Sequence, residues 1–306
     1  MSLIIVFKLT PNSELRTPNS GLKKALMLFT IMLLTPVLRA VTITDDVGRK
    51  VEINTPVSSI VCLSPAHTEM IYWMGKQDIL SAVSTNCDWP AGARKKEKAG
   101  SFMTPDVEKI VQLKPGVVIS GGGIQKKAIS RLEKLGIPVI VLYPMNLTKG
   151  IWDDITIIGR LTGDPVMARN KIIEYERALD SVASPSEMPM RVYIELWNQP
   201  VMAVGKASFI NEAVRLAGGK NILHDAKTEY PKVSPEEIIK RNPEVIILLY
   251  KPEADYLKRE YFLQTAAGKK GNIYVLDSFD MLLRPGPRIP QGIRILKDIL
   301  HKAAMK

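Results

Sequence analysis

The sequence predicts an α/β protein made of two similar Rossmann-like lobes with parallel sheets, joined by one long backbone helix. Three observations support this fold class. Short apolar runs alternate with helical segments, the second half of the chain repeats the first, and a long strand-free segment separates the halves. Strands that alternate with helices favour parallel sheets, and 306 residues are enough for two cores of ordinary domain size.

Composition places the chain among ordinary globular proteins. It is 46% hydrophobic and 24% charged, with a mean hydropathy of +0.02, which excludes a disordered, collagen-like or polytopic membrane chain. Two cysteines are too few for a disulfide scaffold, and three histidines are few for a histidine-rich metal site. The formal net charge of +11 is the unusual value.

Residues 1–40 have the pattern of a signal peptide. Lys23 and Lys24 precede an apolar run of about 14 residues that ends before Arg39 and Ala40. The run is shorter than the roughly 20 residues that a transmembrane helix needs, and Pro36 interrupts it. We therefore expect export to the periplasm or another extracytoplasmic compartment, with an uncleaved anchor as the alternative. Removal of this segment lowers the formal charge to +7.

The remaining charge does not suggest nucleic acid. Lysines and arginines are scattered over predicted helices without an aromatic-basic cluster, so no nucleic-acid partner is expected.

Residues 41–146 are predicted to form the N-terminal lobe. Four short runs rich in valine and isoleucine are typical of strands buried on both faces: SSIVCLS (58–64), QDILSAVS (77–84), PGVVIS (115–120) and IPVIVLY (137–143). Helical segments HTEMIYWMG (67–75) and KKAISRLEKLG (126–136) each end at a glycine suited to a left-handed C-terminal cap.

Residues 147–184 are predicted to be helical and to include the helix between the lobes. The periodicity breaks once, at Gly163, after which Asp164 is a suitable N-cap and Pro165 a suitable first helical residue. A helix from there to about Val182 is about 28 Å long, enough to pass from one lobe to the other. Strands resume at RVYIELW (191–197), within a C-terminal lobe predicted over residues 185–306.

Two segments of the first half recur in the second. DVEKIVQLKPGVVI (106–119) matches SPEEIIKRNPEVII (234–247), and TEMIYWMGKQDIL (68–80) matches NEAVRLAGGKNIL (211–223). The offset between the copies falls from 143 to 128, so the second copy has the shorter intervening loop. Chance similarity of two helix–strand units is the alternative explanation.

The repeat places one glutamate at the same position in each half. Asp106 and Ser234 are predicted N-caps, Glu237 completes a capping box with Ser234, and Glu108 and Glu236 are left to face solvent. Acidic residues also suit first helical turns because of the helix dipole. The functional hypothesis is that these two carboxylates dock onto two basic sites of a partner.

Taken together, these motifs resemble class III (helical-backbone) substrate-binding proteins of ABC importers, most closely the group that binds cobalamin. The resemblance covers nearly all of the chain after Val41 and rests on the order and spacing of several segments: TITDDVGRKVEI, IVCLSPAHTEMIYWMG, CDWP, GSFMTPDVEKIVQLKPGVVIS, GRLTG, VSPEEIIKRNPEVIIL and RPGPRIPQGI. It implies a monomer that captures a metal chelate between its lobes and delivers it to a permease dimer with ATPase subunits. It also implies that Glu108 and Glu236 are the permease-docking residues.

The resemblance further implies a set of ligand-binding positions. Aromatic contacts fall on Phe102 and Tyr230, an apolar contact on Met202, and polar contacts on Asp280 and Arg284. Large flat ligands bind against aromatic faces while a few polar groups fix their orientation. Two further positions that are aromatic in similar proteins are Asn86, which we include in the site, and Gly121.

Ligands other than cobalamin are therefore considered. The less aromatic cleft keeps an iron-siderophore open, whereas Ser101-Phe102 stands where haem binders place a ligating tyrosine, which makes haem the weaker candidate. No resident cofactor and no protein metal site are expected. A two-lobed α/β enzyme is the third hypothesis, but the chain lacks a P-loop, a G-x-S-x-G motif and a complete dinucleotide fingerprint, so we expect a non-enzyme.

Several other residues carry weaker expectations. His67 is predicted at a strand-to-helix turn that faces the cleft, as a cap-region residue rather than a metal ligand. Cys62 and Cys87 are expected to be thiols, although export would permit a disulfide. The glycines at 121–123, followed by Gln125 and Lys126, open a helix that could bind an anionic group. Trp73 is expected in the core and Trp89 as a brace for its loop.

Overall fold

The structure is a computed structural model that describes residues 39–122 and 125–306. The predicted signal peptide therefore lies outside the described residues, except for Arg39 and Ala40, which begin the first strand. Gly123 also lies outside them. No helix in the described part of the chain is both long and apolar enough to cross a membrane.

The first lobe contains a four-stranded parallel sheet in the order β4–β3–β5–β6. All four predicted strands are present, each shorter than its apolar run: β3 (Ile60–Cys62), β4 (Leu80–Val83), β5 (Val117–Ser120) and β6 (Val139–Val141). The helical elements around it are α2 (Pro65–Trp73), η1 (Gln77–Ile79), α3 (Ala91–Arg94), α4 (Val107–Leu113) and α5 (Lys126–Lys134). An antiparallel hairpin, β1 (Arg39–Thr44) with β2 (Lys50–Thr55), precedes the sheet and was not anticipated.

The second lobe repeats this topology. Its parallel strands run in the order β9–β7–β10–β11, and β8 adds an antiparallel partner to the far end of β7. The strands are β7 (Met190–Asn198), β8 (Val201–Ala203), β9 (Gly219–Asn221), β10 (Val245–Leu248) and β11 (Ile273–Val275). Around them are α8 (Phe209–Leu216), α9 (Pro235–Arg241), η3 (Ala254–Lys258), α10 (Glu260–Leu263), α11 (Ala266–Lys269), α12 (Asp280–Leu283) and α13 (Ile289–Ala304).

The repeated helices end in the same way. Lys114, which follows α4, and Asn242, which follows α9, both adopt the left-handed conformation, with φ of 45° and 44°. Each precedes a proline, which cannot continue the helix, and then a buried strand. The shared cap, helix length and strand order show that the internal repeat is structural.

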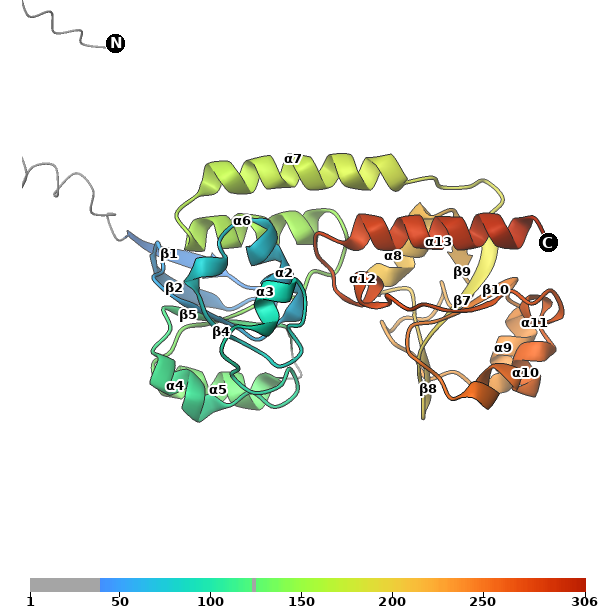
Figure 1. Cartoon of the computed structure of the whole chain (residues 1–306), viewed down its shortest axis with the longest axis horizontal. Helices are drawn as coiled ribbons and strands as arrows, with labels where there is room; N and C mark the ends of the chain where they lie inside the picture. Colours follow the sequence, from blue (N-terminus) through green and yellow to red (C-terminus); the bar gives the residue numbers. More distant parts are fainter. Residues whose placement is uncertain (1–38, 123–124) are drawn as a thin grey trace, which may run out of the picture. The chain divides into compact units, whose positions relative to one another are not determined.

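One helix connects the two lobes, as predicted. The strand-free segment forms α6 (Lys149–Leu161) and α7 (Pro165–Val182), separated at Gly163, whose φ is 70°. Asp164 caps α7 by accepting a hydrogen bond from the amide of Met167 at 3.0 Å. Helix α7 packs on α6 of the first lobe and on α13 of the second (Figure 1).

Both sheets are buried on their two faces. Ile60 and Cys62 of β3 face a core that continues through α6, α7 and α13 into the second lobe, whereas Val61 faces a core closed by α4 and α5. In the second lobe, Ile194 faces the shared core and Tyr193 faces a separate one. The burial explains why these strands appear in the sequence as continuous apolar runs.

The loop that is longer in the first lobe lies between β4 and α4. It contains α3 and the CDWP segment, whereas the second lobe passes from β9 to α9 without a helix. This additional segment carries Asn86 and Asp88, two of the polar side chains that border the candidate site.

One predicted cap is only half formed. Ser234 accepts a hydrogen bond from the amide of Glu237 at 3.3 Å, as expected. The capping box predicted for Glu237 is wrong, because its carboxylate pairs instead with Arg241, one turn along the helix, at 2.5 Å. An i,i+4 ion pair therefore replaces the reciprocal hydrogen bond to the cap.

Candidate functional site

A cleft of about 350 Å³ lies at the carboxyl ends of the first-lobe strands and is closed on one side by the second lobe. Ser64 follows β3, Asn86 follows β4, Gly121 follows β5 and Tyr143 follows β6. The second lobe contributes the α12 region. Loops at the carboxyl ends of parallel strands are the usual ligand sites of open α/β sheets, so this is where the fold favours binding.

The structure brings four of the six predicted ligand residues together. Asn86, Phe102, Asp280 and Arg284 all line the cleft. The other two lie in the second lobe and are not among its lining residues. Tyr230 is half-buried and follows Glu229, which contacts the cleft residue Tyr143, whereas Met202 lies on β8 and pairs with Trp197 and Lys232.

Phe102 is held in the cleft by neighbouring polar groups. Its amide donates to Asn86 Oδ1 at 2.8 Å, and its carbonyl accepts from Gln125 Nε2 at 2.7 Å. The ring lies against Gly121, where an added Cβ would be 2.6 Å from Phe102 Cε2. The Phe102 ring therefore fills space that an aromatic side chain at position 121 would need.

Gln125 is hydrogen-bonded to neighbouring groups of the protein. Its Oε1 accepts hydrogen bonds from the Ser120 hydroxyl at 2.5 Å and from the Gly121 amide at 3.2 Å. The side chain thus ties the end of β5 to the Phe102 loop.

His67 lines the cleft, as predicted, and forms part of a buried chain of polar groups. Its Nδ1 lies 2.7 Å from Ser64 Oγ, and its Nε2 lies 2.7 Å from Asp154 Oδ2 on α6. Burial raises the pKa of Asp154, and the charge of His67 partly offsets that effect. Both ring nitrogens are occupied by side chains, so the geometry supports a positioning role over metal ligation.

Arg284 sits in the cleft among carboxylates. Its guanidinium lies 2.7 Å from Asp88, 2.9 Å from Glu69 and 3.3 Å from Asp280. Burial alone would lower the pKa of Arg284, but the hydrogen bonds to Asp88 and Glu69 outweigh it and raise the pKa above its usual value. Arg284 is therefore a fixed cation whose donors are already directed at acidic partners.

Two further aromatic residues, one lining the cleft and one exposed near the end of β7, were not singled out from the sequence. Tyr143 lines the cleft, and its hydroxyl donates to Glu229 of the second lobe at 2.8 Å. Trp197 is 54% exposed near the end of β7, with its ring 6.3 Å from that of Tyr250. Both stand at the carboxyl ends of predicted strands, and that position was the signal that could have identified them.

The second lobe contains a buried carboxylate held by tyrosines. Glu195, at the end of the parallel part of β7, accepts hydrogen bonds from the hydroxyls of Tyr193 at 2.8 Å, Tyr250 at 2.6 Å and Tyr256 at 2.5 Å. Burial raises the pKa of Glu195, although the three hydroxyls oppose the shift. This cluster fixes the aromatic side chains behind Trp197.

Both cysteines are buried free thiols, as expected. Burial raises the pKa of Cys62 to about 12, so this thiol is unreactive at neutral pH. Among residues 39–122 and 125–306, no group of three or more histidine, cysteine, aspartate and glutamate side chains is arranged to hold a metal ion.

The two repeated glutamates are exposed. Glu108 and Glu236 occupy the second positions of α4 and α9. Hydrogen bonds from its own amide and from the Ser234 hydroxyl lower the pKa of Glu236. In the part of the chain that the structure describes, neither glutamate forms an intramolecular ion pair, so both carboxylates are available to a partner.

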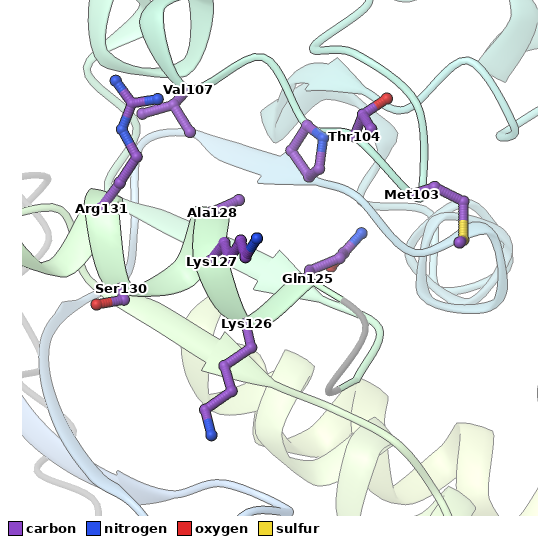
Figure 2. Close-up of a pocket in the computed structure, with 10 residues that line it drawn as sticks. Met103, Thr104, Val107, Gln125, Lys126, Lys127, Ala128, Ser130 and Arg131 are labelled. Carbon is purple, nitrogen blue, oxygen red and sulfur yellow. The ribbon is translucent and has the colours of Figure 1, made fainter.

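A second cavity, of about 1010 Å³, lies between the loop before α4 and helix α5 (Figure 2). Met103, Thr104 and Val107 line one side, and the basic residues Lys126, Lys127 and Arg131 of α5 line the other. None of the predicted ligand residues lines it. It borders the first turn of α4, which carries Glu108, and so belongs to that surface rather than to the cleft.

Comparison with known proteins identifies one family and several similar proteins of the same kind. A family model described as "Periplasmic binding protein" matches residues 60–279. A vitamin B12-binding protein of Vibrio vulnificus is 30% identical over 239 residues, which cover 76% of this chain and 86% of the relative.

Two solved structures show the same similarity. A possible iron-binding periplasmic protein of Staphylococcus epidermidis is 27% identical, with a TM-score of 0.71 over 81% of this chain and all of its own. The periplasmic vitamin B12-binding protein of Vibrio cholerae is 25% identical, with a TM-score of 0.68 over 82% of this chain and 99% of its own. These proteins confirm the two-lobed fold predicted from the sequence.

Proposed function

Because the chain belongs to the periplasmic binding protein family, we propose that it is the substrate-binding protein of an ABC importer and captures cobalamin or a related corrinoid outside the cytoplasm. It would hold the ligand between its lobes and deliver it to a membrane permease dimer with ATPase subunits. The observation that carries this proposal is the cleft, where Phe102 and Tyr143 of the first lobe face Asp280 and Arg284 of the second.

The chemistry of the cleft suits part of a large, flat, amide-bearing ligand. Phe102 and Tyr143 offer apolar faces, while Asn86 and Ser64 offer neutral hydrogen-bonding groups. A cavity of about 350 Å³ encloses an edge of a corrinoid, so the rest of the ligand would extend between the lobes towards Tyr230 and Trp197. Met202, on the strand that pairs with Trp197, would contribute at most an outer apolar contact.

Delivery would depend on Glu108 and Glu236. Their matching positions on two repeated, exposed helix starts support docking to two equivalent basic sites, such as a permease dimer offers. The protein would act as a monomer and a carrier, without catalysing a reaction. Export would use the apolar segment within residues 1–40 as a signal peptide.

An iron-siderophore is the alternative cargo, with haem a weaker one. Two observations support the iron-siderophore as a candidate. The chain is similar to a possible iron-binding protein, and Asn86 and Gly121 stand at positions that are aromatic in similar cobalamin-binding proteins.

Competitive titration separates the cargoes. Tryptophan fluorescence of the purified protein is followed while cyanocobalamin, a ferric siderophore or haem is added, alone and in competition. The proposal expects cyanocobalamin to quench at micromolar concentration and to be displaced poorly by the other two. If the ferric siderophore binds more tightly than cyanocobalamin, the proposed cargo is wrong and the iron-siderophore alternative is supported.

A further inference from the structure

A buried ion-pair network joins the two lobes at the edge of the cleft. Its centre is Glu69, on α2 of the first lobe, whose side chain is 1% exposed. Glu69 accepts two hydrogen bonds from Arg288, at 2.7 and 2.6 Å, and one from Arg284, at 2.9 Å. Both arginines belong to the second lobe, where they flank the turn between α12 and α13.

Additional contacts fix the two arginines. Arg284 also contacts Asp88 at 2.7 Å and Asp280 at 3.3 Å, while Arg288 stacks over the ring of Trp89, with its Cζ 4.5 Å from the ring centroid. Trp89, which was predicted to brace its own loop, therefore packs against the second lobe. Arg284 and Arg288 are both more than four-fifths buried, and buried guanidinium groups require paired carboxylates to offset their lost hydration.

The network itself carries no surplus positive charge. Three carboxylates, those of Glu69, Asp88 and Asp280, surround two guanidinium groups, for a local charge of −1. The two terminal nitrogens of Arg284 already contact carboxylates, so an anionic group on a ligand would compete with these carboxylates for the same donors. Displacement of Glu69 would cost this buried carboxylate its hydrogen bond from Arg284 and leave it with the two from Arg288, which makes the exchange unfavourable.

The other cleft-lining side chains reinforce this selectivity. Ser64, Asn86 and Tyr143 carry neutral hydroxyl or amide groups, and both ring nitrogens of His67 are engaged with Ser64 and Asp154. Neutral groups of this kind match the primary amides at the edge of a corrinoid. A carboxylate in the same place would meet Asp280 and the acidic side of the network.

We propose that Glu69 determines ligand specificity: by occupying Arg284 and Arg288 it makes the cleft select neutral, amide-bearing chelates over chelates that carry carboxylates. Glu69 is a positioning residue, since it acts through the two arginines. This inference rests on the proposed corrinoid-binding function and specifies the substrate class at the same site.

The test compares two probes that differ only in charge. One is cyanocobalamin, and the other is its monocarboxylate derivative, in which one peripheral amide has been hydrolysed. Calorimetric titration is performed on the wild-type protein and on Glu69→Gln, which preserves the shape of the side chain. We expect the wild type to bind the monocarboxylate about tenfold more weakly, as one extra like charge in a partly buried site predicts, and Glu69→Gln to lose most of that difference.

A matched control comes from the repeat. Glu212 on α8 is the counterpart of Glu69 in the second lobe, but it contacts the Leu147 amide and Arg215 rather than Arg284 and Arg288. Glu212→Gln should therefore keep the wild-type discrimination between the two probes.

If Glu69→Gln does not fold, Asp88→Asn provides the test, because the half-exposed Asp88 side chain also pairs with Arg284. Asp88→Asn should reduce the discrimination partially.

The outcomes are distinguishable. Wild-type protein that binds both probes equally, or folded variants that keep the full discrimination, would overturn the role of Glu69 while leaving corrinoid binding intact. Wild-type protein that binds neither probe would overturn the proposed function and the inference with it.

Discussion

At the residue scale, the shape of the cleft depends on the contact between Phe102 and Gly121. The Phe102 ring lies where a side chain at position 121 would otherwise be, and Asn86 and Gln125 hold the Phe102 backbone on either side. The Phe102 ring thus occupies the space that an aromatic side chain at position 121 would need. The ring can offer its other face to a ligand.

Gly121→Ala should weaken ligand binding. The new Cβ would lie 2.6 Å from Phe102 Cε2 and 3.1 Å from Ser64 Cβ, so the ring must shift into the cleft. We expect the affinity for cyanocobalamin to fall about tenfold, measured by calorimetry. In Phe102→Ala, which removes the clash, the additional Gly121→Ala change should have little effect; an equal loss in both backgrounds would contradict this explanation.

Glu195 should make the stability of the protein pH-dependent. Burial raises its pKa in the folded state above the value of about 4.3 expected in the unfolded chain. The folded state therefore binds the proton more tightly, and the free energy of unfolding should fall as the pH rises from about 4.3 towards the raised pKa. Glu195→Gln should flatten this part of the profile, measured by urea denaturation between pH 4 and 8; an unchanged slope would contradict the prediction.

At the element scale, helices α4 and α9 are two copies of one unit. Each begins at a side-chain N-cap, places an exposed glutamate at its second position and ends at a left-handed residue. The two cap residues differ in chemistry. The left-handed conformation is unfavourable for the lysine side chain of Lys114, whereas asparagine tolerates it because its short polar side chain can form local hydrogen bonds. Asn242 also accepts a hydrogen bond from the Ala266 amide at 2.7 Å.

Exchanging these caps should have opposite effects. Lys114→Asn should stabilise the protein by about 0.5 kcal/mol, because the left-handed conformation costs asparagine less. Asn242→Lys should destabilise it by about 1–2 kcal/mol, because it also removes the hydrogen bond to Ala266. Urea denaturation measures both changes, with Lys114→Ala as a control that should not reproduce the gain; effects of the same sign would contradict the equivalence of the caps.

Local sequence signals predicted most of these elements. The apolar runs gave the strands, Asp164 and Gly163 gave the start of α7, and the offset between the repeats located the longer loop. The network around Glu69 was not predictable in this way, because Glu69 and Arg288 are 219 residues apart and meet only when the two lobes are folded. The pairing of His67 with Asp154, 87 residues later, was missed for the same physical reason.

At the scale of the whole molecule, one helix and one charge network constrain the lobes. Helix α7 packs on α6 and α13, and Glu69 binds two arginines across the cleft. A continuous helix resists bending more than a flexible linker does, so we expect ligand binding with little domain motion. The two glutamates that we propose for docking, Glu108 and Glu236, would then keep a nearly fixed spacing whether or not the ligand is bound.

Glu108→Ala combined with Glu236→Ala should abolish stimulation of the transporter ATPase. The ligand affinity should remain unchanged, because neither residue lines the cleft. Reconstituted ATPase activity and calorimetric titration measure the two properties separately. Glu187→Ala, which removes an exposed carboxylate between α7 and β7, is the control and should retain stimulation. Loss of ligand affinity in the double variant would show that these glutamates act in binding.

The most direct test of the central claim is calorimetric titration of the purified wild-type protein with cyanocobalamin. If the cleft between the lobes is a corrinoid site, the protein should bind one molecule per chain with a dissociation constant of about 1 μM or below, which corresponds to at least about 8 kcal/mol of binding free energy. No binding heat at micromolar concentrations, together with saturable binding of a ferric siderophore or haem, would contradict it.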